Sequence, residues 1–137
     1  MVCIYCGGNT RVVNSRSSKR NPNIWRRRQC DSCKEIFTTN ELPDLSRSVS
    51  IINHQDALET FSTDRLYMSV FKALSHREDA LNDARHITNT ITTKLLQEHS
   101  DGAIKIVDLK MICLNTLENF DKVAGTYYSA YHPTRAN

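Results

Sequence analysis

Two pairs of cysteines, each spaced as Cys-x-x-Cys, are the residues of this chain best suited to chemistry. The pairs are Cys3 with Cys6 and Cys30 with Cys33. Two thiolates separated by two residues can reach one metal ion, and a second pair completes a tetrahedral shell. The spacing therefore predicts a four-cysteine metal site of the zinc-ribbon type, in which two turns are joined by short antiparallel strands.

Two disulfides, or four unrelated thiols, are the alternative interpretation of these cysteines. No apolar signal segment precedes Cys3, which disfavours a secreted and oxidised protein. A redox Cys-x-x-Cys motif is expected once and within a βαβ pattern, unlike the arrangement here. Iron remains a second candidate metal for the same four thiolates.

The metal is also expected to stabilise the N-terminal segment. Residues 1–46 are too few to bury a sufficient apolar core. Structural zinc contributes on the order of 10–16 kcal/mol of folding free energy, so we expect this segment to unfold without metal. Four protein ligands leave no open coordination position, which argues against a catalytic zinc.

Charge is distributed unevenly along the 137 residues. Residues 1–48 carry nine Lys and Arg against four Asp and Glu, and residues 49–137 carry nine against eleven, for a net charge of +3. A small basic module suits a polyanion. No segment approaches 18 consecutive apolar residues, so the sequence predicts no membrane partner.

Three adjacent arginines lead directly into Cys30, so the metal site would hold them rigidly. In a strand, Arg26 and Arg28 share one face and Arg27 lies on the other. Guanidinium groups bind phosphates and guanine edges, whereas the alternative is a solvated edge that discourages strand aggregation. The residues predicted to bind DNA are Arg11, Arg16, Trp25, Arg26, Arg27 and Arg28, with Trp25 suited to stack on a base or sugar.

The rest of the chain predicts a hairpin followed by four helices. Residues 40–48 are predicted to form a connection, and residues 49–52 and 57–61 the two strands of a hairpin. Apolar spacing predicts helices over 63–75 and 78–98, the second with Leu81 among its core residues. After a short extended piece at 104–106, Asp108 and Asp121 are expected to cap the third and fourth helices.

The apolar stripes of these helices are predicted to form the core, including Val123, Tyr127 and Tyr131 on the last helix. Cys113 is expected to be a buried small hydrophobe. The sequence contains no nucleophile elbow, Walker A loop or GxGxxG pattern, and it indicates no active site. The predicted class is α+β, with a small antiparallel ribbon over 1–46 and a hairpin with four helices over 47–137.

Four motifs occur in order in the ribbon: Cys3-x-x-Cys6-Gly7, Val13-Asn14-Ser15-Arg16, Arg26-Arg27-Arg28-Gln29-Cys30-x-x-Cys33 and Phe37-Thr38-Thr39-x-Glu41. Together they resemble the NrdR family, the bacterial repressors of ribonucleotide reductase genes. The C-terminal part is similar to the ATP-cone of that family in element order and in Phe61, Leu66, Asp121-x-Val123-Ala124 and Ser129-x-Tyr131. The chain is therefore identified as a divergent member.

The resemblance implies a DNA-binding zinc ribbon over 1–46 and an ATP-cone-like regulatory and oligomerisation domain over 47–137. It implies a cytoplasmic, nucleoid-associated homo-oligomer that represses promoters and catalyses nothing. Zinc is the implied cofactor, double-stranded promoter DNA the partner, and ATP or dATP the effector. The positions implied to bind the nucleotide are Asn53, Glu59, Arg65 and Lys110.

The chain departs from the pattern of the family at a few positions. Trp25 stands where the family has a further Arg, and Ile106 where related cones have a hydroxyl residue. Asn53 and His54 replace a basic pair, and the following turn lacks its glycine. Because a triphosphate carries several negative charges, losing these cations should weaken nucleotide binding.

Three functions remain open at this point. The first is a DNA-binding repressor whose cone sets the oligomeric state according to the bound adenine nucleotide. The second keeps DNA binding but makes the cone a fixed oligomerisation domain. The third is a zinc-ribbon adaptor that binds RNA or a protein.

Overall fold

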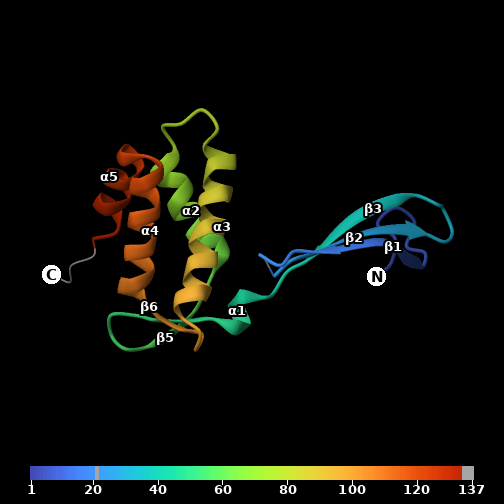
Figure 1. The fold of residues 1–137 in the computed structure, drawn as a ribbon, viewed down its shortest axis with the longest axis horizontal. Coiled ribbons are helices and arrows are strands. Elements are labelled where there is room, and N and C mark those ends of the chain that lie inside the picture. The colour runs from blue at the N-terminus through green and yellow to red at the C-terminus, as the bar shows by residue number, and fades with distance from the viewer. Residues whose placement is uncertain (21, 134–137) are drawn as a thin grey trace. The chain divides into compact units, whose positions relative to one another are not determined.

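The structure, a computed structural model, describes residues 1–20 and 22–133. The chain divides into two compact units, Met1–Asp44 and Leu45–Asn137, which we call the ribbon unit and the helical unit. Strands make up the first, and helices with short strands make up the second (Figure 1). The predicted α+β class is confirmed.

The ribbon unit is a three-stranded antiparallel sheet in the order β1-β2-β3. Its strands are β1 (Thr10–Ser17), β2 (Ile24–Cys30) and β3 (Ile36–Glu41). The pairing of β1 with β2 shifts register between Val12 and Asn14, which indicates a β-bulge at Val13. Among the described residues of this unit, Cys3, Cys30 and Phe37 form the buried apolar cluster. So small a core agrees with a fold that depends on metal.

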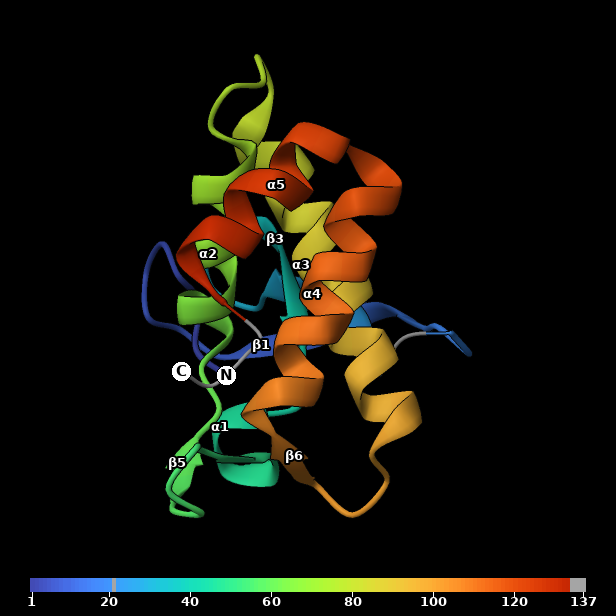
Figure 2. The same cartoon turned by 90° about the vertical axis from the view of Figure 1, so that its left-hand side faces the viewer.

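As far as residue 133, the helical unit contains four long helices and a three-stranded sheet. The helices are α2 (Thr63–Leu74), α3 (Ala80–Glu98), α4 (Ile106–Phe120) and α5 (Lys122–Tyr131). The strands β4 (Ser50–Ile52), β5 (Leu58–Thr60) and β6 (Ala103–Lys105) are ordered β5-β4-β6. Figures 1 and 2 both show the strands at one end of the four helices. None of the helices in the described part of the chain has the length and apolar character needed to cross a membrane.

The predicted hairpin and four helices are confirmed, with small differences at the ends. The hairpin pairs β4 with β5, and β6 adds to β4 in parallel. The segment predicted as a connection contains a four-residue helix, α1 (Leu45–Ser48). Asp121 caps α5 by accepting hydrogen bonds from the N–H groups of Val123 and Ala124, at 2.8 and 3.1 Å.

The prediction that Asp108 caps the third helix is wrong. Helix α4 begins three residues earlier than this cap would place it, at Ile106 after the extended Lys105, and Asp108 lies within its first turn. A carboxylate there still interacts favourably with the positive end of the helix dipole.

Two predictions about the core are also wrong. Leu81 is 60% exposed. The buried face of α3 includes Ala80 and Ala84, which are four positions apart, and Leu81 lies outside that face. Tyr127 and Tyr131 on α5 are exposed as well, at 44% and 54%, as is Val123. Side chains of α2 and the loop after it contact these rings instead: the Lys72 ammonium lies 3.8 Å from the Tyr131 ring centre, and the His76 ring contacts that of Tyr127 edge-on.

Candidate functional site

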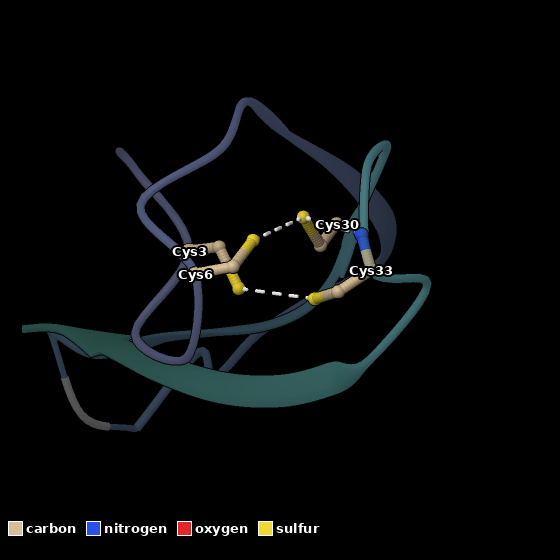
Figure 3. Close-up of side chains that lie close together, drawn as sticks. All are labelled: Cys3, Cys6, Cys30 and Cys33. Carbon is tan, nitrogen blue, oxygen red and sulfur yellow. Dashed lines mark hydrogen bonds between the residues drawn. The ribbon is translucent and has the colours of Figure 1, made fainter.

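The four predicted metal ligands come together in the ribbon unit. The Sγ atoms of Cys3, Cys6, Cys30 and Cys33 all lie within 4.8 Å of one another. Cys3 Sγ is 3.7 Å from Cys33 Sγ, and Cys6 Sγ is 3.5 Å from Cys30 Sγ (Figure 3). A tetrahedral ion with Zn–S bonds of about 2.3 Å separates its sulfurs by about 3.8 Å. The observed spacing therefore fits a zinc ion bound by four thiolates.

The two turns that carry the cysteines, residues 3–8 and 30–35, are closed by backbone hydrogen bonds. Cys3 N–H donates to the Gly8 carbonyl at 2.8 Å, and Cys30 N–H donates to the Glu35 carbonyl at 3.0 Å. Gly7 has φ of 73°, a left-handed conformation that glycine adopts without strain. A side chain at Gly8 would place its Cβ 2.7 Å from Ser32 Oγ, so this glycine permits the close approach of the two turns.

Backbone N–H groups point at the sulfurs of Cys3 and Cys30. Tyr5 N–H donates to Cys3 Sγ at 3.4 Å. Cys33 N–H, together with Ser32 N–H, donates to Cys30 Sγ, and these bonds lower the pKa of the Cys30 thiol to about 6. The thiolate is the form that binds metal, so these backbone bonds prepare the Cys30 sulfur for a cation. All five cysteines lie in the described residues, and none forms a disulfide.

Cys113 is fully buried in the helical unit, as predicted. Burial raises the pKa of its thiol to about 11, which keeps it protonated and unreactive. Cys113 therefore belongs to the core and not to a functional site.

The predicted DNA-binding residues are divided between the two sides of the ribbon sheet. Residues directly opposite each other in an antiparallel sheet point to the same side. Arg16 pairs with Trp25, and Arg11 pairs with Gln29, two positions from Arg27. One side, which we call the open side, therefore carries Arg11, Arg16, Trp25 and Arg27. Arg26 and Arg28 lie on the other side, together with Cys30 and the buried Phe37.

The guanidinium groups of the two sides have different partners. On the side of Phe37, Arg26 forms an ion pair with Glu41, and Arg28 Nε donates to Thr39 Oγ1 at 3.4 Å. On the open side, the Arg16 guanidinium lies 5.7 Å from the Trp25 ring centre. Arg11 donates to Gln29 Oε1 at 2.9 Å and lies 3.7 Å from an Asp31 carboxylate oxygen.

Three of the four residues predicted to bind nucleotide line one pocket of about 160 Å³ in the helical unit. Glu59, Arg65 and Lys110 line it, from β5, α2 and α4 respectively. Asn53 does not line the pocket, but its Nδ2 donates to Glu59 Oε1 at 2.8 Å. The volume is below the roughly 300 Å³ at which small-molecule sites begin.

Sequence reasoning missed the contact that His54 makes at this pocket. Lys110 Nζ donates to His54 Nε2 and to the Pro133 carbonyl, both at 3.3 Å. Asn53 and His54, which replace the basic pair of the family, are thus hydrogen-bonded to Glu59 and Lys110. Both of these partners are polar residues that line the pocket. His54 and Lys110 are 56 positions apart, so no local pattern in the sequence could predict their contact.

Comparison with known proteins supports the predicted resemblance. Residues 1–41 match the family model described as "Transcriptional repressor NrdR-like, N-terminal domain". The chain is 26% identical over 133 residues to the protein named transcriptional repressor NrdR of Streptococcus sanguinis strain SK36, covering 96% of this chain and 83% of that protein. The protein of the same name in Streptococcus pneumoniae strain R6 is 24% identical with the same coverage. The resemblance to the NrdR repressors is confirmed by these matches.

Proposed function

We propose that this chain, a divergent relative of the NrdR transcriptional repressors, is itself a zinc-dependent transcriptional repressor and not an enzyme. The observation that carries the proposal is the convergence of four cysteine sulfurs at the end of a sheet bearing five arginines. The metal would fix the sheet, and the sheet would present guanidinium groups to the phosphates and bases of duplex DNA. Promoter binding by a regulator of this kind takes place in the bacterial cytoplasm, at the nucleoid.

Ribonucleotide reductase promoters are the proposed targets, and a homo-oligomer is the proposed binding form. A single small ribbon buries little DNA surface, so one module alone reaches limited affinity. Two or more ribbons on one oligomer can occupy spaced half-sites and gain affinity through effective concentration. The proposed division of the chain is a DNA-binding ribbon over 1–46 and a regulatory and oligomerisation domain over 47–137.

DNA binding is tested by fluorescence anisotropy with the zinc-loaded protein. The probes are a labelled duplex of ribonucleotide reductase promoter DNA, a mixed-sequence duplex of equal length, and an RNA of the same sequence. Preference for the promoter duplex supports the proposal. Equal or tighter binding to RNA, or binding to none of the three probes, would replace it with the zinc-ribbon adaptor.

We further propose that the pocket of the helical unit binds ATP or dATP weakly. Glu59 would accept a hydrogen bond from the ribose or base, and Arg65 and Lys110 would face the phosphates. Asn53 and His54 supply no permanent cation, and each lost charge-assisted bond costs about 1.5–3 kcal/mol. Restoring one cation by Asn53→Lys should therefore tighten dATP binding about tenfold or more.

Calorimetric titration with dATP measures this effect in the wild type, Asn53→Lys and Lys110→Ala. Lys105→Ala is the matched control, because Lys105 is exposed and does not line the pocket. Size-exclusion chromatography with and without dATP shows whether the oligomer responds to the nucleotide.

A fixed oligomerisation domain is the second candidate for the helical unit. The bonds of Asn53 to Glu59 and of Lys110 to His54 favour it, because they satisfy groups that a nucleotide would otherwise use. If neither the wild type nor Asn53→Lys binds dATP at millimolar concentration, this candidate replaces nucleotide sensing.

A further inference from the structure

The two sides of the ribbon sheet differ in how much of each is covered. On the side of Phe37, the first cysteine turn packs on the sheet, with the Tyr5 ring 6.4 Å from the Phe37 ring in an edge-on arrangement. On the open side, Arg11, Arg16 and Arg27 are exposed, and Trp25 is half-buried between Arg16 and Asn40 on the neighbouring strands. The open side is thus the larger accessible surface of the sheet.

The charges of the two sides differ as well. The open side has three arginines, and Asp31, at the end of β2, is the acidic group that pairs with one of them, Arg11. Among the described residues, Arg27 forms no ion pair, and it lies at the centre of the middle strand. The opposite side has two arginines, of which Arg26 is paired with Glu41. An unpaired guanidinium reaches a phosphate without first breaking an existing ion pair.

We propose that the open side contacts the nucleic acid, with Arg27 as its central phosphate or base contact and Trp25 as an adjacent apolar contact to a base or sugar. Arg26, which the sequence predicted to bind DNA, is in this proposal a positioning residue instead, because its ion pair with Glu41 fixes β2 to the end of β3. This assignment rests on the proposed DNA-binding function and specifies its contact surface. Charge complementarity to a polyanion, together with the half-buried Trp25 beside the arginines, is what selects DNA as the occupant.

The β-bulge at Val13 supports the assignment. Arg11 and Arg16 are five positions apart, so regular alternation would place them on opposite sides of β1. The extra residue at Val13 reverses the alternation, so both pair with residues of the Trp25 side. The bulge therefore collects a third arginine on the same surface.

Neighbouring arginines on opposite sides provide a matched test. Arg27→Gln and Arg26→Gln make the same change one position apart, in the full zinc-loaded chain. We expect Arg27→Gln to weaken binding of the promoter duplex about tenfold and to reduce the slope of log affinity against log salt by about 0.9. Arg26→Gln should stay within about twofold of the wild type. Glu41→Gln, which breaks the same ion pair without removing a cation, should also leave binding intact and controls for loss of fold.

Trp25 gives an independent readout, because it is the only tryptophan of the chain. Saturation with duplex should change its fluorescence emission, since stacking on a base or sugar alters the surroundings of the indole. Unchanged emission at saturation, or equal losses of DNA affinity in Arg26→Gln and Arg27→Gln, would overturn the assignment of the open side as the contact surface. Neither outcome would overturn the proposed DNA-binding function. Failure of the wild type to bind either duplex would overturn the proposed function with it.

Discussion

Asp121 shows how much a single side chain can connect. One carboxylate oxygen accepts the N–H groups that begin α5, and the other accepts from Arg77 Nη1 at 2.9 Å and lies 3.1 Å from His76 Nε2. Arg77 also donates to Asp83 at 2.6 Å and covers the ring of Phe120. Asp121 thus joins the start of α5 to the loop between α2 and α3.

We predict that the Asp121 carboxylate makes the helical unit sensitive to acid. The N–H of Ala124, followed by the Arg77 guanidinium, lowers its pKa from 3.8 to about 2. Because the pKa of Asp121 is lower in the folded state than in the unfolded state, its ionised carboxylate stabilises the fold at pH values above the unfolded-state pKa. This stability is lost as the pH falls from about 4 to about 2. Thermal unfolding followed by helical circular dichroism should show this loss in the wild type and a smaller one in Asp121→Asn.

Asp79→Asn is the control for this measurement. Asp79 precedes α3, but its side chain accepts no capping hydrogen bond. The control should follow the wild-type acid dependence. Identical acid dependence in the wild type and Asp121→Asn would contradict the assigned role of Asp121.

At the scale of elements, α3 shows which apolar residues stabilise the helical unit. Leu95 is 2% exposed and packs in the main core, whereas Leu81 on the same helix is 60% exposed. Both are leucines in a regular helix, so their intrinsic helix propensities are equal. The difference between them is tertiary packing alone.

We predict that Leu95→Ala lowers the free energy of unfolding of the helical unit by about 2–5 kcal/mol, because it removes buried methyl groups and leaves a cavity. Leu81→Ala, the matched change at an exposed site, should alter it by less than about 0.5 kcal/mol. Urea unfolding followed at the helical signal measures both. Similar losses in the two variants would show that the exposed position of Leu81 is incorrect.

At the scale of the whole molecule, the two units have different sources of stability. Within residues 1–20 and 22–133, the helical unit buries an apolar cluster of eighteen residues, whereas the ribbon unit buries three, of which two are predicted metal ligands. Hydrophobic burial can hold the first together, but the second needs the metal to offset its loss of conformational entropy. The units should therefore unfold separately.

We predict that Cys33→Ser, or removal of the metal by a chelator, unfolds residues 1–44 while the helices remain. The expected readouts are loss of one zinc per chain by elemental analysis, new proteolytic cleavage within the ribbon unit, and unchanged helical circular dichroism. Cys113→Ser is the matched control, since it should retain zinc and destabilise only the helical unit. Protein purified without chelator that contains no metal would contradict the prediction, as would a ribbon that resists proteolysis without metal.

The sequence by itself determined the features that depend on local spacing. Two Cys-x-x-Cys pairs define a four-cysteine site because each pair needs only one tight turn to converge its sulfurs. The hairpin, the four helices and the Asp121 cap follow from residues within one or two turns of one another. Three adjacent arginines before Cys30 indicated a polyanion partner without any knowledge of their orientation.

Only the tertiary structure decided how these elements combine. The register and the bulge at Val13 place Arg11 and Arg16 on the side of Trp25 and Arg27. The exposed Tyr131 ring of α5 contacts the Lys72 ammonium of α2 outside the core, and the parallel addition of β6 to β4 completes the second sheet. The contact between His54 and Lys110 joins residues 56 positions apart. Such outcomes depend on which distant segments meet, and no periodicity within a single element encodes that choice.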